Sequence, residues 1–148
     1  MFRGRFEHTV DSKGRVSIPA RFREVLQTQY GSEELVLTVY DSCVVAFPSA
    51  EWRKWEEKLR ELPLLRQETK RFFRYFLSGA VDCSLDPQGR LLIPAHMRAQ
   101  VGLKKEVVLV GMLKGFEIWD KEAWRQEMER CQQLFDRVSE TIAEWMGF

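Results

Sequence analysis

The sequence predicts an α+β protein with a mainly β core and peripheral helices, in which two copies of one unit form a single pseudo-two-fold β-barrel. The first observation is an internal repeat: residues 11–26 read DSKGRVSIPARFREVL and residues 86–101 read DPQGRLLIPAHMRAQV. The second is that the match resumes at residues 35–37 and 107–109, where the offset falls from 75 to 72. Such a repeat indicates one supersecondary unit used twice. Since four short strands and one short helix close a core poorly alone, we expect the two units to pair their hairpins, with their first turns close together.

Each unit is expected to run strand, turn, strand, short helix, strand, turn, strand. Residues 4–10 are rich in residue types that favour strands, and Asp11 and Gly14 suit the first and last positions of a turn. A short strand follows at 15–18, and Pro19 opens a helix to about residue 27, since a missing N–H is harmless in the first helical turn. The remaining elements are a helix at 94–101 that stops at Gly102, and strand pairs at 34–40 with 44–47 and at 106–110 with 116–119.

Three helices are expected outside the two units. Ser49 is a good N-cap for a helix that reaches about residue 62, and Pro63 begins a second helix that ends before Gly79. A third helix begins after Asp120 and runs nearly to Gly147, with apolar residues at helical spacing. The predicted organisation is repeat 1 at residues 5–50, a helical connector at 51–77, repeat 2 at 79–122 and a C-terminal helix at 123–148.

Composition and charge narrow the classes of function. The chain has 148 residues, 45% of them hydrophobic, which fits a folded protein. No apolar run approaches a membrane span, the N-terminus lacks a signal-peptide core, and the three cysteines are odd in number with no Cys-x-x-Cys. We therefore expect a cytoplasmic protein with no membrane partner. Residues 1–25 hold six basic and three acidic residues, whereas residues 117–148 hold eight acidic and four basic ones, so one face is suited to a polyanion.

Nothing in the sequence favours an enzyme. The histidines are His8 and His96, and neither belongs to a paired metal-binding motif. His96 takes the place of Arg21 in the other copy, which indicates a surface position on a helix. The cysteines lie among apolar residues and are interpreted as small core residues. We expect no catalytic residues, no metal site and no cofactor.

The two turns carry the candidate site. Each presents an aspartate, a polar or basic residue, a glycine and an arginine at a hairpin tip. Arg15 and Arg90 can neutralise phosphates or contact guanine in the major groove, which a β-ribbon is narrow enough to enter. The glycines allow backbone N–H groups to approach a phosphate. The candidate DNA-binding residues are Lys13, Arg15, Gln88, Arg90, Arg3, Arg5, Arg21, Arg23 and Arg98, and the residues that shape the turns and orient the arginines are Asp11, Gly14, Asp86 and Gly89.

A purely structural interpretation of each turn is the alternative. An aspartate and an arginine four residues apart can simply pair with each other, and exposed pairs are common and weak. Two copies with the same arginine, beside further basic residues, favour a duplex-binding face. Residues 67–76 interleave aromatic and basic side chains; we assign the aromatic ones to packing and keep the basic ones as auxiliary phosphate contacts.

These motifs resemble a known family. The segments DSKGRVSIPA at 11–20 and DPQGRLLIPA at 86–95 are similar to the signature of the AbrB-type swapped-hairpin domain. Two copies in one short chain, after the opening FRGRFEHTVD at 2–11, resemble the bacterial MraZ family over nearly the whole chain. The resemblance implies two AbrB-like repeats in one swapped-hairpin barrel, with the Asp-x-x-x-Arg motifs facing double-stranded DNA.

The resemblance also implies a biological role. Members of the family are transcriptional regulators of the division and cell-wall gene cluster, usually including their own promoter, and bind tandem promoter repeats as ring-like homo-oligomers. We expect a nucleoid-associated repressor, in which several barrels on one ring raise the avidity for DNA. Gln88 stands opposite Lys13 and His96 opposite Arg21, so the first copy is expected to carry more phosphate affinity.

Two other functions stay open. AbrB-like domains also occur in antitoxins, usually with a disordered charged tail, whereas the tail here is predicted to be helical with an apolar stripe. A scaffolding protein, whose assembly is its function, would not need Arg15 and Arg90. The acidic, apolar-striped C-terminal helix is a candidate for packing between subunits, away from DNA.

Overall fold

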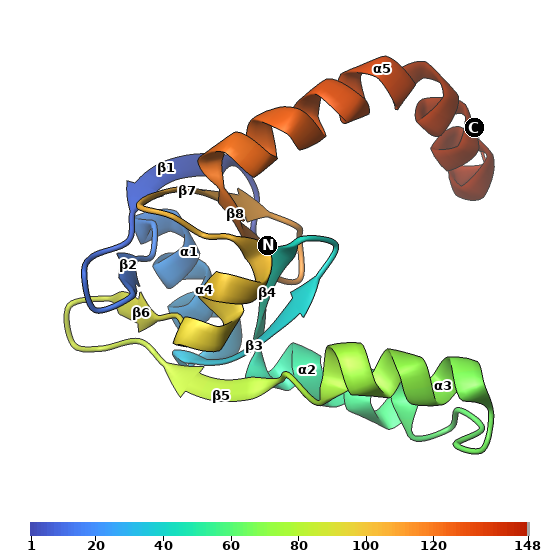
Figure 1. Ribbon diagram of the computed structural model, residues 1–148, viewed down its shortest axis with the longest axis horizontal. Helices are drawn as coiled ribbons and strands as arrows, with labels where there is room; N and C mark the ends of the chain where they lie inside the picture. Colours follow the sequence, from blue (N-terminus) through green and yellow to red (C-terminus); the bar gives the residue numbers. More distant parts are fainter. Residues whose placement is uncertain (148) are drawn as a thin grey trace.

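The computed structural model describes residues 1–147 and confirms the mixed class with a mainly β core (Figure 1). Two of its helical segments, η1 and η2, are π-helices. The elements in chain order are β1 (Arg5–Thr9), β2 (Arg15–Ser17), α1 (Ala20–Val25), η1 (Leu26–Tyr30), β3 (Glu34–Tyr40), β4 (Cys43–Pro48), α2 (Ser49–Leu59), α3 (Gln67–Phe72), η2 (Phe73–Leu77), β5 (Val81–Ser84), β6 (Arg90–Leu92), α4 (Ala95–Val101), β7 (Glu106–Gly111), β8 (Phe116–Asp120) and α5 (Lys121–Met146).

The sheet shows that the two repeats exchange strands. Six antiparallel strands lie in the order β1-β7-β8-β4-β3-β5, so β1 of the first repeat pairs with β7 of the second, and β5 of the second pairs with β3 of the first. Counterpart strands of the two repeats (β1 and β5, β7 and β3, β8 and β4) lie at equal distances from the centre of the sheet. At that centre, in the β4–β8 pair, Val45 lies opposite its own counterpart Glu117. Strands β2 and β6 form a separate two-stranded ribbon in which Val16 lies opposite its counterpart Leu91. The expected pseudo-two-fold axis therefore passes through both pairs.

The sheet does not close into the expected barrel. Within residues 1–147, β1 and β5 are its two edges, and the β2–β6 ribbon is not joined to either edge by a continuous ladder. Only an isolated bridge, Val10 to Val16, links the end of β1 to the ribbon. The ribbon is short because Pro19 and Pro94 follow it almost at once, and proline has no N–H to donate to a neighbouring strand.

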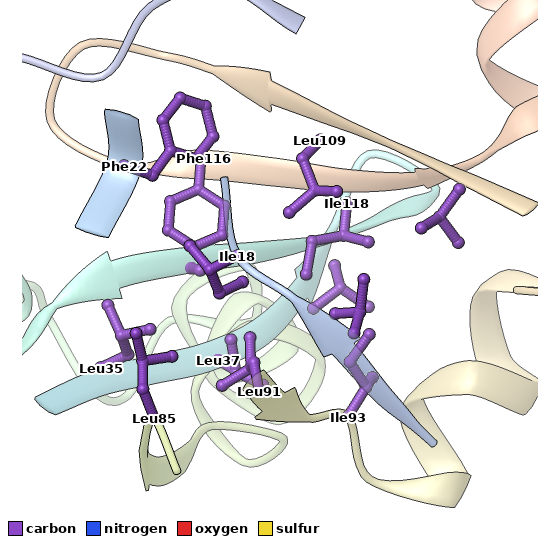
Figure 2. Packing of buried hydrophobic residues seen from close by; sticks show 14 of the residues in the cluster. Ile18, Phe22, Leu35, Leu37, Leu85, Leu91, Ile93, Leu109, Phe116 and Ile118 are labelled. Atoms are coloured by element: carbon purple, nitrogen blue, oxygen red, sulfur yellow. The ribbon is translucent and has the colours of Figure 1, made fainter. Parts of the chain in front are cut away.

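The main core lies between one face of the sheet and the ribbon with its two helices. Figure 2 shows Ile18 and Leu91, from the ribbon and its flank, gathered with Leu37 and Phe116 from the sheet. Phe22 of α1 is fully buried, with its ring centroid 5.1 Å from that of Phe116. Each such side chain stabilises the fold by about 1.5–3 kcal/mol, so the core fixes the ribbon firmly against the sheet.

The opposite face of the sheet is covered by the connector helices. Trp52 of α2 and Phe76 of η2 are buried there with Trp119 of β8. The buried hydroxyl of Thr38 on β3 donates to the Phe76 carbonyl oxygen at 2.5 Å. These contacts hold the connector on the side of the sheet away from the ribbon.

Several predicted helix boundaries are wrong. Pro48, not Ser49, occupies the N-cap position of α2, and the helix ends at Leu59 rather than near residue 62. Pro63 does not begin a helix: the Arg66 N–H donates to the Pro63 carbonyl in a turn, and α3 starts at Gln67. Proline suits a turn as well as a first helical turn, and the neighbouring Leu65 is 90% exposed, so no core packing favours an earlier start.

The C-terminal helix forms as predicted. The Asp120 side chain caps α5 by accepting from the N–H groups of Glu122 and Ala123 at 3.2 and 3.4 Å, and Gly147 ends the helix with a φ of 80°. Its first turns pack on the sheet through Trp124, whose ring lies 5.8 Å from that of Trp119, while the rest extends away (Figure 1). Among the described residues, no helix combines the length and apolar character needed to cross a membrane.

Candidate nucleic-acid interface

The two hairpin turns have the same hydrogen-bond pattern. In the first, the Asp11 carboxylate accepts from the backbone N–H groups of Lys13 and Arg15, both at 2.9 Å, while the Gly14 N–H donates to the Asp11 carbonyl at 3.0 Å. In the second, Asp86 accepts from Gln88 and Arg90 at 2.9 Å and from the Gly89 N–H at 2.9 Å. Both glycines have positive φ, 89° and 76°, a conformation that glycine adopts without strain.

Each aspartate also holds its arginine. Arg15 Nε donates to Asp11 Oδ2 at 2.7 Å, and Arg90 Nε donates to Asp86 Oδ2 at 2.8 Å. The backbone N–H of Arg15, with the side-chain bond from the same residue, lowers the pKa of Asp11 to about 2, and the equivalent bonds lower the pKa of Asp86. Both carboxylates are thus ionised at neutral pH. Because only Nε is engaged by these bonds, the terminal guanidinium nitrogens are left for a ligand.

The ribbon presents both arginines on one outer face. Val16 and Leu91 point to the core, so the residues on either side of them point outward. Arg15 lies opposite Leu92, two residues from Arg90, which makes the two arginines diagonal neighbours with Cα atoms roughly 7–8 Å apart. The predicted closeness of the two turns is therefore confirmed, and Figure 1 shows the β1–β2 and β5–β6 connections together at one end of the molecule.

Backbone and side-chain contacts tie each turn to the other repeat. The Ile18 N–H donates to the Gly89 carbonyl at 3.0 Å, and the Ile93 N–H donates to the Gly14 carbonyl at 2.9 Å. Arg98 of the second repeat lies over Gly14, and Arg23 of the first lies over Gly89: a Cβ on either glycine would fall 2.7–2.9 Å from the nearest side-chain atoms of that arginine. The two turns are thus one rigid unit.

Arg23 and Arg98 therefore each pack against the turn glycine of the other repeat. Both are half-buried, and Arg98 Nε donates to the Ile93 carbonyl at 3.0 Å. Arg23 Nε is buried and has no hydrogen-bond partner within residues 1–147. Local sequence does not indicate these two contacts, because each arginine meets a turn that is distant in the sequence.

The structure does not bring every candidate to the ribbon. Arg3 and Arg5 lie at the opposite end of β1, roughly 20 Å along the strand from the first turn. The Arg5 guanidinium is 6.0 Å from the Trp124 ring centroid, so it faces α5. Arg21 is exposed on α1. The basic residues of 67–76 lie on the connector, which projects from the other end of the molecule from the turns (Figure 1).

Three further residues near the turns escaped the sequence analysis. Leu92 is 55% exposed on the outer face of the ribbon, opposite Arg15, where an apolar group suits a thymine methyl. Lys104 and Lys105, in the loop before β7, lie beside the first turn, where they border one surface hollow with Asp11, Ser12 and Arg98. Their place depends on the pairing of β1 with β7, which local sequence does not indicate.

The groups that the ribbon presents suit the binding of an anion, and the cysteines that pack in the core are held as neutral thiols. Burial raises the pKa of Cys83 to about 12 and also raises that of Cys43, so both thiols are held protonated. The prediction that the cysteines are core residues is wrong for Cys131, which is exposed on α5. Within residues 1–147, no group of three or more histidine, cysteine and acidic side chains is arranged to hold a metal ion. The outward face of the ribbon instead offers two fixed guanidinium groups in a narrow element that fits a major groove.

Comparison with known proteins identifies the family. The family model described as "MraZ protein, putative antitoxin-like" matches residues 1–75 and again residues 76–144. A protein of Caldanaerobacter subterraneus subsp. tengcongensis named "Transcriptional regulator MraZ" is 43% identical over 143 residues, 96% of each chain. Proteins of the same name from Natranaerobius thermophilus and Desulforamulus reducens are 39% and 41% identical, over 98% and 97% of this chain and 99% of their own. The chain belongs to the MraZ family.

Proposed function

We propose that this protein is a sequence-specific DNA-binding transcriptional regulator that contacts duplex DNA through the paired hairpin turns. The observation that carries the proposal is the β2–β6 ribbon, on which Arg15 and Arg90 are both fixed by their aspartates and point from the same face. A single exposed ion pair of this kind contributes little to stability. Two copies held in one rigid unit instead form a preorganised site for phosphate or for guanine edges. The names of the relatives support a role in transcription.

The proposal extends to the target and the assembly. We infer a cytoplasmic, nucleoid-associated repressor of the division and cell-wall gene cluster, including its own promoter, that binds tandem promoter repeats as a ring-like homo-oligomer. Residues 5–50 and 79–122 are the DNA-binding repeats in this scheme, residues 51–77 the connector, and residues 123–148 the assembly helix. One ribbon neutralises few phosphates, so several ribbons on one ring raise affinity by making later contacts intramolecular.

The exposed apolar side of α5 supports assembly. Phe135 and Trp145 are 65% and 77% exposed, and Leu134, Val138 and Ile142 follow on the same helix with 41–49% exposure. An isolated helix with such a stripe is unfavourable in water, so a second copy of this chain is the expected partner. Deleting residues 121–148 should reduce the mass measured by light scattering, and an unchanged assembly would exclude α5 from the interface.

The test of DNA binding is fluorescence anisotropy with the DNA upstream of the protein's own coding sequence and a scrambled duplex. Arg15→Glu with Arg90→Glu should abolish the preference for the native DNA while leaving the assembly intact. The matched control is Arg53→Glu with Arg60→Glu, the same charge change on exposed residues of the connector. Equal weak binding to both duplexes would indicate a non-specific role, and no binding by the native protein would overturn the proposal.

A second candidate function is an antitoxin-like partner of another protein, which the description of the matching family model favours. In that case the other protein, a toxin, would co-purify with the native chain and also with the Arg15→Glu, Arg90→Glu variant. If the protein is instead a scaffold, the same double variant should behave like the native protein in the cell.

A further inference from the structure

The two hairpin turns share a backbone but differ in the charge around them. Beside the first turn, a surface hollow of about 510 Å³ is bordered by three basic side chains from two separate segments. The residues that line it are Val10, Asp11, Ser12, Arg98, Leu103, Lys104 and Lys105. Lys104 and Lys105 are both exposed, and neither belongs to an ion pair between described residues.

The pseudo-two-fold axis identifies the equivalent positions at the second turn. The Val10 N–H donates to the Lys105 carbonyl at 2.8 Å, and the Leu85 N–H donates to the Glu33 carbonyl at 3.4 Å. Glu33 therefore occupies the place of Lys105, and Ser32, one residue earlier, the place of Lys104. Glu33 further accepts a hydrogen bond from Gln27 at 3.2 Å.

Other differences between the turns act in the same direction. Lys13, exposed at the tip of the first turn, is replaced by Gln88 in the second. The cations around the first turn are Lys13, Arg15, Arg98, Lys104 and Lys105, against the carboxylates of Asp11 and of Asp120, which accepts from the Lys104 N–H at 3.1 Å; the nearby Glu122 is paired with Arg125. The cations around the second turn are Arg23 and Arg90, against Asp86 and Glu33. Since each turn aspartate is paired with its own arginine, the first side has an excess of free positive charge and the second does not.

We propose that Lys104 and Lys105 bind DNA phosphates and make the first hairpin the dominant anchor on the duplex. This inference rests on the proposed DNA-binding function and assigns to it two residues outside the Asp-x-x-x-Arg motifs. Asp11, which holds Arg15, borders one hollow with the two lysines, so a phosphate bound at the first turn is attracted by them as well. A phosphate bound at the second turn meets Glu33 at the equivalent place, and the like charge repels it. Each neutralised phosphate releases condensed counterions, so the phosphate contacts of the lysines make the binding constant fall more steeply with salt concentration.

The test exchanges the charges of the two sides. Lys104→Ser with Lys105→Glu gives the first turn the residues that stand at the equivalent positions beside the second turn. The loss of two phosphate contacts should reduce the slope of log K against log salt by about 1.8 and weaken binding by up to about 60-fold at 0.1 M salt. The reverse pair, Ser32→Lys with Glu33→Lys, should steepen the slope by a similar amount. Arg15→Ala should weaken binding more than Arg90→Ala does.

The control is Lys114→Ser with Lys58→Glu, the same charge change at exposed lysines away from the turns. Circular dichroism and light scattering of every variant keep misfolding and altered assembly apart from lost contacts. If Lys104→Ser with Lys105→Glu changes the salt slope no more than the control, this inference fails while DNA binding by the native protein stands. If the native protein binds no duplex, the proposed function itself fails.

Discussion

Replacing Gly14 by alanine should destabilise the protein by two separable effects. Gly14 has a φ of +89°, and its Cβ would lie 2.8 Å from the guanidinium carbon of Arg98. The left-handed backbone costs alanine about 1–2 kcal/mol. Moving Arg98 aside breaks its bond to the Ile93 carbonyl, a loss of about 1 kcal/mol. Together these predict a decrease of about 2–3 kcal/mol in the free energy of unfolding.

Gly102→Ala provides the matched comparison. Gly102 has a φ of +66°, but nothing lies within 4 Å of its Cβ position, so only the backbone strain applies. Urea unfolding followed by tryptophan fluorescence, at one protomer concentration, gives both free energies of unfolding. Gly14→Ala should lose about 1 kcal/mol more than Gly102→Ala. Equal losses for the two variants would refute the proposed packing of Arg98 on the first turn.

A double-mutant cycle isolates the collision. In the Arg98→Ala background there is no guanidinium for the new methyl group to displace, so Gly14→Ala should lose only the strain component. The expected coupling between the two substitutions is about 1 kcal/mol, within the range seen for contacting residues. Strict additivity would show that the two positions do not touch.

Three further predictions concern acid stability, helix capping and thiol reactivity. The pKa of Asp11 is about 2 in the folded protein, below its ordinary 3.8. The contribution of the ionised Asp11 to stability is therefore complete above pH 3.8 and is lost as pH falls through about 2. Between pH 5 and pH 2, the free energy of unfolding measured in urea should fall more steeply for the native protein than for Asp11→Asn. Asp120→Ala removes the cap of α5 and should reduce the free energy of unfolding by about 1–2 kcal/mol, whereas Asp136→Ala on the exposed part of the same helix should change it by less than about 0.5 kcal/mol. Ellman's reagent should modify the exposed Cys131 of the protomer before the buried Cys43, and an equally fast reaction of Cys43 would contradict its burial.

The features that local sequence determines were predictable. The turns needed only Asp11, Gly14 and their counterparts, because an aspartate that accepts nearby N–H groups and a glycine at positive φ form a turn without help from distant residues. The pairing of Arg15 with Asp11 follows from the same geometry. The association of the two units was also accessible, since the repeat required them to share one core, and the resemblance to swapped-hairpin domains implied the exchange of strands.

The features that depend on tertiary contacts were not predictable. The three extra residues of the first repeat lie where α1 continues into the π-helix η1, which ends at Gly31 with Tyr30 stacked on Phe2. No local pattern distinguishes this extension from a longer loop. The contact of Arg98 with the first turn arises only after the repeats exchange strands, and so does the position of Lys105. The sheet stayed open because the ribbon is too short to join its edges.

Fusion of the two repeats in one chain explains how a two-fold scaffold can present an asymmetric surface. Some contacts between the repeats use identical residues, as with Ile18 and Ile93, which bond to the opposite turn glycines, whereas others do not, as where Val45 lies opposite its counterpart Glu117. The exposed Lys105 faces outward, and so its counterpart can differ. In a homodimer every substitution appears at both equivalent positions, so a basic anchor confined to one turn can arise only when both repeats belong to a single chain.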